Sequence, residues 1–450
     1  MKTETAADAP VASTDDPPPL VEEPHPQSRS TPAARTLGRE TPAARNAKWN
    51  DWRWQMRNRI RTVDQLKAYF PIIDDTGISK AAEKFPLAVT PYYASLIQRA
   101  NSSDPIYRMC VPEAAELEDP PFLSDDPLEE DEDMPVPNLV HRYPDRALFI
   151  VTTTCASYCR HCTRKRVAGA RETSISQRQM DRVLAYLAAH PEISDVIVSG
   201  GDAFTMSTEA LEKILAALRS VPSIDIIRIG TRTPVVMPMR ITGELVSMLR
   251  KYHPIWVNTH FNHPNELTRE AAEACGRLVD GGIPMGNQSV LLAGVNDNPQ
   301  TIERLSRGLV KIRVRPYYLF QCDLVRGVEH FRTPLSRGIE IMEYLRGRVG
   351  GIAIPLFVVD APHGGGKIPV LPNYVVSMSP THTVLRNYEG MLVSYPEPRK
   401  PGEEPASEAR ETGRPGVWDL ASGRASAIES ESDRRARRRN GKCTLFEGTM

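Results

Sequence analysis

The sequence has no excess of charge of either sign. Its 56 Lys and Arg residues balance its 56 Asp and Glu residues, so the formal net charge is zero. A protein that binds nucleic acid over a broad surface needs a basic excess, and this balance therefore predicts no nucleic-acid partner. The basic run RRARRR at residues 434–439 is more typical of a solvated tail than of a nucleic-acid patch.

Long apolar runs are missing as well. The opening residues, MKTETAADAPVASTDDPPP, lack the apolar segment of a signal peptide, and no later stretch is long and apolar enough to span a bilayer. We therefore expect no membrane partner and a cytoplasmic location. Of the seven cysteines, three lie within eight residues. An odd, clustered set in a cytosolic chain favours a metal site over disulfides.

The composition divides the chain into five parts. Residues 1–46 and 401–450 are rich in Pro, Ala and charge, which predicts two disordered tails. Residues 47–140 predict an N-terminal helical region that ends in an acidic linker, and the acidic run 125–133 is expected to be solvated. Residues 377–400 are interpreted as a C-terminal extension.

Residues 141–376 alternate between short apolar runs and segments with helical spacing, which predicts an α/β core. The expected strands are 147–152, 195–200, 225–231, 254–260, 285–292, 312–319 and 352–359. Ser176 and Gln179 predict a capping box at the start of the first intervening helix. Strands that alternate with helices form a parallel sheet, and this number of units favours a partial or complete (β/α) barrel. In such barrels the chemistry lies at the carboxyl ends of the strands.

The cysteine spacing is Cys155-x3-Cys159-x2-Cys162, directly after the first expected strand. Three thiolates can hold three irons of a [4Fe–4S] cubane, which leaves the fourth iron open to a small molecule. Zinc normally takes a fourth Cys or His. His161 is available, but it lies between two of the cysteines, where reaching the same ion is awkward. The spacing therefore favours a cluster over zinc.

This spacing resembles the radical SAM superfamily, in which S-adenosylmethionine (SAM) chelates the open iron. Ser199, Gly200, Gly201 and Asp202 follow the second expected strand and resemble the SAM-binding glycine motif of that superfamily. Two glycines at a strand end let the backbone approach a ligand closely. The resemblance implies a partial (β/α) barrel of the radical SAM type.

Lys367 follows three glycines and the last expected strand. It is no P-loop lysine, because Ile368 stands where a P-loop has Ser or Thr. A lysine on a flexible glycine loop at a barrel mouth can bind pyridoxal phosphate (PLP). By spacing alone, a surface lysine in a turn is the commoner outcome.

Longer motifs carry a closer resemblance. WNDWRWQ, HRYPDRALF, CRHCTRKR, SGGDA, RIGTRTPVV, NTHFNHPNE, GNQSVLL, KIRVRPYY, QCDL, EHFRTP and FVVDAP together are similar to the lysine 2,3-aminomutase family. The similarity runs from residue 49 to residue 398. It implies an isomerase that moves an amino group from C2 to C3 of a basic amino acid, with a [4Fe–4S] cluster, SAM and PLP.

The same resemblance implies roles for individual residues. Cys155, Cys159 and Cys162 hold the cluster, and Lys367 holds PLP. The further residues are Arg142 and Arg146 for the PLP phosphate, Ser199, Gly200, Gly201, Asp202, His161, His260 and Gln288 for SAM, Arg164 for the substrate carboxylate, and Asp323 and Asp360 for the substrate's distal cation. Arginine suits phosphate through its planar fork. From the residues alone, Arg164 could equally be solvated and both aspartates could cap helices.

Two carboxylates are what a buried cation requires, so the substrate is expected to be a cation. Of the basic amino acids we favour L-lysine, converted to L-β-lysine, as the family resemblance implies. Arginine remains an alternative, as in the arginine 2,3-aminomutases of antibiotic biosynthesis that resemble this family. His363 stands where the family usually has Gly and could reshape the pocket. A non-catalytic zinc or RNA-binding module is a more distant alternative. The electron donor would be a flavodoxin or ferredoxin.

The family typically carries a structural zinc, with cysteines after GVND and in a C-terminal CxCxxC. Here Asn298 follows GVND, and Cys443 is the only cysteine after residue 398. All these ligands are missing together, which predicts no structural zinc. A homo-oligomer is possible, but any assembly that depends on this zinc is put in doubt.

Overall fold

The computed structural model describes residues 42–70, 76–169, 171–378 and 382–398. The chain divides into two compact units, Met1–Asn373 and Tyr374–Met450. The first unit contains every predicted site residue and the predicted core except for residues 374–376, which belong to the second unit.

The first unit is built on one curved sheet of nine strands that pair in chain order. The strands are β1 (Leu139–Tyr143), β2 (Arg146–Thr152), β3 (Asp195–Gly200), β4 (Ile226–Gly230), β5 (Ile255–Thr259), β6 (Met285–Leu291), β7 (Arg315–Gln321), β8 (Leu356–Ala361) and β9 (Gly366–Pro369). Strands β2 to β8 are parallel, whereas β1 and β9 are antiparallel to their neighbours. All seven predicted strands are present, and the predicted partial barrel is confirmed.

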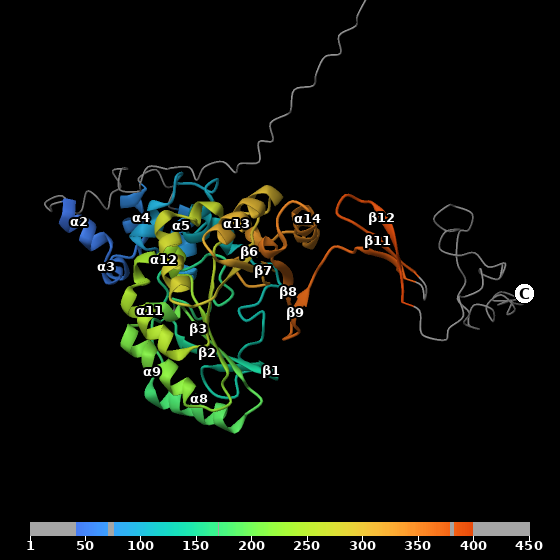
Figure 1. Cartoon of the computed structure of the whole chain (residues 1–450). Helices are drawn as coiled ribbons and strands as arrows, with labels where there is room; N and C mark the ends of the chain where they lie inside the picture. The colour runs from blue at the N-terminus through green and yellow to red at the C-terminus, as the bar shows by residue number, and fades with distance from the viewer. Residues whose placement is uncertain (1–41, 71–75, 170, 379–381, 399–450) are drawn as a thin grey trace, which may run out of the picture. The chain divides into compact units, whose positions relative to one another are not determined.

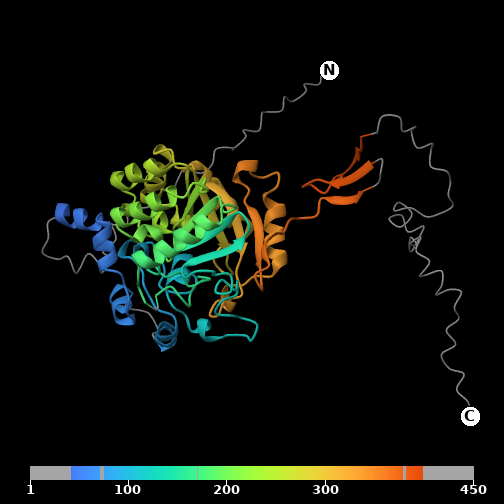
Figure 2. The same cartoon turned by 90° about the horizontal axis from the view of Figure 1, so that it is seen from below.

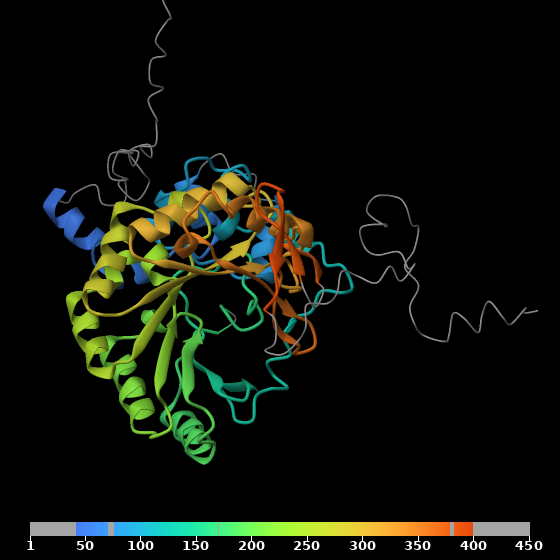
Figure 3. The same cartoon turned by 45° about the vertical axis from the view of Figure 1, so that its right-hand side comes forward.

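The sheet does not close through strand pairing, because β1 and β9 stand at opposite ends of the strand order. The two edges still meet at one point. The Tyr143 hydroxyl on β1 accepts a hydrogen bond of 3.0 Å from the backbone N–H of Lys367 on β9. Figure 3 shows the curved sheet with its helices outside.

Each parallel connection carries a helix that covers the outer face of the sheet (Figures 1 and 2). These helices are α8 (Gln177–Ala189), α9 (Thr208–Arg219), α10 (Thr233–Val236), α11 (Gly243–Leu249), α12 (Arg269–Asp280), α13 (Pro299–Lys311) and α14 (Leu335–Leu345). The predicted capping box of Ser176 and Gln179 begins α8. Apolar residues at spacings of three and four face the core, as Leu211, Leu215 and Leu218 do in α9.

The N-terminal helices pack at the cysteine end of the barrel. They are α2 (Pro42–Trp49), α3 (Trp52–Arg57), α4 (Val63–Tyr69), α5 (Thr76–Lys84), α6 (Pro91–Ser95) and α7 (Pro105–Cys110). The backbone N–H groups of Tyr158 and Arg160 donate to the carbonyls of Ala88 and Met109, at 2.8 and 2.9 Å. The helical region therefore fixes the path of the cysteine loop.

The acidic segment (residues 125–133) is not simply solvated, which corrects the expectation from its composition. Glu130 is only 4% exposed and forms an ion pair of 2.6 Å with Arg164. Asp133 pairs with Arg142, and Asp126 pairs with Arg166, at 2.6 and 3.0 Å. This segment packs because it neutralises arginines beside the barrel mouth.

The second unit contains a three-stranded antiparallel sheet of β10 (Val375–Met378), β11 (His382–Arg386) and β12 (Leu392–Pro396). The predicted tail 401–450 lies outside the described residues. So does the predicted tail 1–46, except for its last residues, where α2 begins at Pro42. Within the described ranges, we find no helix with the length and apolarity that a bilayer crossing requires.

Candidate active site

Two adjoining cavities occupy the carboxyl ends of the strands and the barrel interior. The larger one, of about 1210 Å³, is lined by Lys367 and Asp360, and the smaller one, of about 210 Å³, by the three clustered cysteines. Residues that line both cavities are Thr163, Arg164, Ser199, Gly230, His260 and Val290. The cysteines and Lys367 therefore face connected spaces at the same end of the barrel, and not opposite ends.

The cysteine loop follows β2 and is held by buried contacts. Arg160, which is 1% exposed, donates two hydrogen bonds to Glu116, at 2.8 and 2.7 Å. Burial and the neighbouring Cys159 raise the pKa of Cys162 to about 11. Iron would replace the protons of such buried thiols, since thiolates are the ligand form.

The donor set of the three cysteines fits a [4Fe–4S] cluster. In the described part of the chain, no three His, Cys, Asp or Glu side chains are placed as ligands of one metal ion. A cubane instead takes each thiolate on a separate iron corner, so its three ligands need not converge on one point. The three sulfurs around one small cavity match that requirement.

The loop after β3 approaches the cysteine loop closely. A Cβ on Gly201 would stand 2.3 Å from the Thr154 carbonyl oxygen, and Gly200 has a φ of +124°. Both positions therefore require glycine. The Asp202 carboxylate accepts hydrogen bonds from the Thr231 hydroxyl at 2.6 Å and from the Arg232 backbone N–H at 2.8 Å. Asp202 thus positions this loop, while Ser199 lines both cavities.

The residues predicted to contact SAM differ in their surroundings. His260 Nδ1 lies 3.0 Å from the Gln288 carbonyl, which can only accept, so Nδ1 carries the proton and Nε2 is an acceptor. Burial lowers the pKa of His260 to about 4, so it is neutral at pH 7. The Gln288 side chain lines the larger cavity. His161 is buried, and its Nε2 lies 3.4 Å from the Asn262 amide.

Lys367 lies on an ordered strand and not on a flexible loop, which corrects the sequence-based expectation. The β8–β9 hairpin places Lys367 opposite Asp360, and Nζ lies 2.9 and 3.2 Å from the two carboxylate oxygens. The ammonium also lies 5.3 Å from the centre of the Phe320 ring. His363 turns this hairpin with a φ of +58°, and its Nδ1 lies 2.8 Å from Glu129.

Asp323 follows β7 and shares the larger cavity with Asp360. One of its oxygens accepts a hydrogen bond from the Thr163 hydroxyl, and the other is buried without a partner in the described structure. Burial, and then the negative charge of Asp360, raise the pKa of Asp323 to about 6. Neither aspartate caps a helix. Two carboxylates beside one cavity can bind a cation.

Arg142 and Arg146 flank the turn between β1 and β2. Both line the larger cavity, and Arg146 stacks 3.8 Å from the centre of the Tyr143 ring. Arg142 contacts the Leu128 carbonyl and Asp133, whereas Arg146 contacts Asp145. Two guanidinium groups at one cavity wall can bind a phosphate.

Arg164 is held in a fork by Glu130. Its Nε and Nη2 donate to both carboxylate oxygens, at distances from 2.6 to 3.2 Å. Nη1 has no partner that the structure shows within the described residues, so this nitrogen can donate to a ligand carboxylate. Because Glu130 binds the other two nitrogens, Arg164 is not simply solvated.

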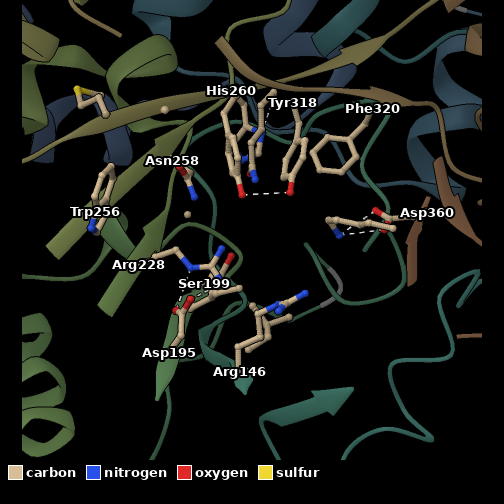
Figure 4. Close-up of a pocket in the computed structure, with 18 of the residues that line it drawn as sticks. Arg146, Asp195, Ser199, Arg228, Trp256, Asn258, His260, Tyr318, Phe320 and Asp360 are labelled. Carbon is tan, nitrogen blue, oxygen red and sulfur yellow. Dashed lines mark hydrogen bonds and ion pairs between the residues drawn. The ribbon is translucent and has the colours of Figure 1, made fainter. Parts of the chain in front are cut away.

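Sequence reasoning missed several residues of the larger cavity, which Figure 4 shows. Arg228 on β4 pairs with Asp195 on β3, with two N–O distances of 2.9 Å. Tyr317 donates a hydrogen bond of 3.1 Å to the Tyr318 hydroxyl. Because polar side chains on a parallel strand are unusual in a core, Arg228 within an otherwise apolar run was the available signal.

Comparisons with known proteins bear on this site. A radical SAM superfamily model matches residues 149–305, and a lysine-2,3-aminomutase model matches residues 342–444. The chain is 54% identical to the L-lysine 2,3-aminomutase of Clostridium subterminale, over 78% of this chain and 85% of that protein. It is 51% identical to the L-lysine 2,3-aminomutase of Bacillus subtilis (78% and 75%), and 44% identical to the glutamate 2,3-aminomutase of Clostridioides difficile (80% and 85%).

Proposed function

We propose, since this chain belongs to the lysine 2,3-aminomutase family of radical SAM enzymes, that it converts L-lysine to L-β-lysine with PLP as a further cofactor. Membership makes the protein an isomerase of the aminomutase type and implies the cluster and SAM. It does not fix the substrate, because one relative is named for glutamate.

The observation that carries the proposal is the pair of carboxylates beside Lys367. Asp360 binds the Lys367 ammonium, and Asp323 keeps a buried oxygen without a partner in the described structure. If Lys367 held PLP, its nitrogen would no longer be a free ammonium, and both carboxylates could then bind the distal cation of a substrate. A glutamate side chain would be repelled there, since like charges in a buried site are unfavourable.

The chain's own residues then have defined tasks. Arg142 and Arg146 bind the PLP phosphate, Arg164 Nη1 binds the substrate carboxylate, and Cys155, Cys159 and Cys162 bind the cluster. When bound, the cluster with SAM supplies hydrogen abstraction at C3, and PLP carries the migrating amino group.

The loop after β3, His161 and His260 line the smaller cavity, on the SAM side of the site. Ser199 and the backbone at Gly200 and Gly201 line the smaller cavity, where SAM would bind between the cysteines and the larger cavity. His260 Nε2 can accept a hydrogen bond from a hydroxyl group. The buried walls exclude water from the reacting atoms.

Anaerobic incubation of the reduced, reconstituted enzyme with equal lysine and arginine tests the substrate. We expect β-lysine as the main product, identified by mass spectrometry. β-Arginine as the main product would replace lysine with arginine. No β-amino product from either would contradict the proposal.

Lys367→Ala tests the role of PLP. This variant should lose turnover and the absorbance of protein-bound PLP, because its Nζ holds the cofactor. Its iron content should equal that of the wild type. Full activity in Lys367→Ala would remove PLP from the proposal.

We also propose a cytoplasmic enzyme that takes its electron from a flavodoxin or ferredoxin and binds neither membranes nor nucleic acid. The proposal includes no structural zinc. Asn298, at the position of a family zinc ligand, instead caps α13 by accepting from the N–H groups of Gln300 and Thr301, at 2.9 and 3.2 Å.

A further inference from the structure

Two residues of the longer motifs, Arg232 in RIGTRTPVV and Glu266 in NTHFNHPNE, have no role in the function proposed above. The structure brings both to the cysteine loop. Arg232 comes from the first motif, after β4, and Glu266 comes from the second, after β5. Both side chains are buried, with 7% and 0% exposure. A buried ion pair at this place needs an explanation in terms of its surroundings.

In the described structure, Arg232 is the one charged side chain that donates a hydrogen bond to a cysteine of the Cys155, Cys159 and Cys162 set. Its Nη1 lies 2.7 Å from the Sγ atom of Cys159, and this nitrogen can only donate. The structure shows no guanidinium or ammonium hydrogen bond to Cys155 or Cys162 within the same residues. One sulfur of the three is thus singled out.

The remaining nitrogens hold the guanidinium in place. Nη2 donates to Glu266 at 2.6 Å and to the Tyr93 hydroxyl at 2.8 Å, and Nε donates to the His260 carbonyl at 3.2 Å. Glu266 is itself fixed by the Tyr93 hydroxyl at 2.7 Å and by the backbone N–H of His263 at 3.0 Å. The Glu266 carboxylate thus binds Nη2, whereas Nη1 directs the positive charge of the guanidinium toward the Cys159 sulfur.

A cluster becomes more negative by one charge when an external low-potential donor, of the flavodoxin or ferredoxin class, gives it one electron. Hydrogen bonds to the ligand sulfurs and a nearby positive charge stabilise that reduced form and raise the reduction potential. A buried, water-excluded position strengthens the effect, because the local dielectric constant is low.

We propose that Arg232 is a positioning residue that tunes the cluster: it donates a charge-assisted hydrogen bond to the Cys159 thiolate, orients that ligand and raises the potential of the cluster. Glu266 and Tyr93 hold Arg232 for this task. The inference rests on the proposed cluster at Cys155, Cys159 and Cys162. Iron and sulfide content of the wild type test that cluster separately.

The test is an electron-paramagnetic-resonance redox titration of the reconstituted protein without SAM. Arg232→Gln should keep the iron and sulfide content of the wild type and shift the midpoint potential to more negative values. Arg232→Lys keeps the charge but loses the planar fork, so its shift should have the same sign and be smaller. Arg219→Gln is the matched control, because Arg219 is likewise held by several hydrogen bonds, here to the backbone carbonyls of Tyr252, Ile224 and Pro254. Its potential should equal that of the wild type.

An unchanged midpoint potential in both Arg232 variants, when they carry a full cluster, would overturn the inference. If these variants also bound SAM more weakly at the oxidised cluster, Arg232 would be a ligand of SAM instead. If Arg232→Gln does not hold a cluster, Arg232→Lys decides alone: a negative shift supports the inference, and an unchanged potential overturns it.

Discussion

The pKa of the Asp323 carboxyl is expected to set the pH range in which the larger cavity can bind a cation. The pKa of this carboxyl is raised to about 6, first by burial and then by the charge of Asp360. A raised acid pKa means that the group is protonated below about pH 6 and charged above it. Only the charged form attracts a substrate ammonium.

We therefore predict that kcat/KM for the cationic substrate falls as pH drops through about 6. Asp323→Asn should lower kcat/KM about 10- to 100-fold at pH 8, from the roughly 1.5–3 kcal/mol of a hydrogen bond between charged partners. The same variant should lose the acid limb, because it has no carboxyl to titrate. Steady-state rates from pH 5 to 9 check both points. An acid limb that persists in Asp323→Asn would assign it to another group.

Single residues of the site could be predicted from the sequence where a short motif by itself indicates their chemistry. The three cysteines are of this kind, whereas the role of Lys367 was predicted only from the resemblance that the longer motifs carry. Arg232 and Glu130 were not, because their roles come from partners far away in the chain. Arg232 meets Cys159 across 73 residues, and Glu130 meets Arg164 across 34. Charge alone made the acidic segment look solvated, although the burial of Glu130 depends on the arginine beside it.

The loop after β3 depends on glycine at two consecutive positions. Gly201 donates its N–H to the Thr152 carbonyl at 2.6 Å, and the backbone of Thr154 fills the space where a side chain would stand. The neighbour is backbone, which cannot swing aside as a flexible side chain could. This close approach keeps the loop against the cysteines.

We predict that Gly201→Ala destabilises the protein by about 1–3 kcal/mol, the usual effect of overpacking. The matched control is Gly243→Ala at the start of α11, where a Cβ meets nothing within 4 Å. That variant should be neutral or slightly stabilising, because alanine loses less conformational freedom on folding. Urea unfolding of both variants measures the difference. Equal stability of Gly201→Ala and wild type would show that the loop can shift.

At the level of elements, the parallel strands and their helices followed from periodicity and capping residues. The antiparallel edge strands did not. β9 is short, begins at the last of three consecutive glycines and alternates poorly, so its sequence is typical of a loop. Its order comes from pairing with β8 and from Tyr143, neither of which is visible in the local sequence.

For the whole molecule we predict iron without stoichiometric zinc. The reconstituted chain should contain about four irons, because Asn298 carries no thiol and caps α13 instead. Plasma emission spectrometry measures both metals. Treatment with a zinc chelator should leave the unfolding temperature unchanged. One zinc per chain would mean that other ligands have replaced the family's cysteines.

The contact between Tyr143 and Lys367 joins residues 224 positions apart, at the two unpaired edges of the sheet. A single molecule of PLP, bound by Arg142 on β1, by Arg146 on β2 and by Lys367 on β9, would bridge the same edges. During synthesis on the ribosome, Arg142 and Arg146 are available before Lys367, which emerges only with β9. Loading of the coenzyme would thus wait until β9 has emerged, and the bound coenzyme would then connect the two open edges of the barrel.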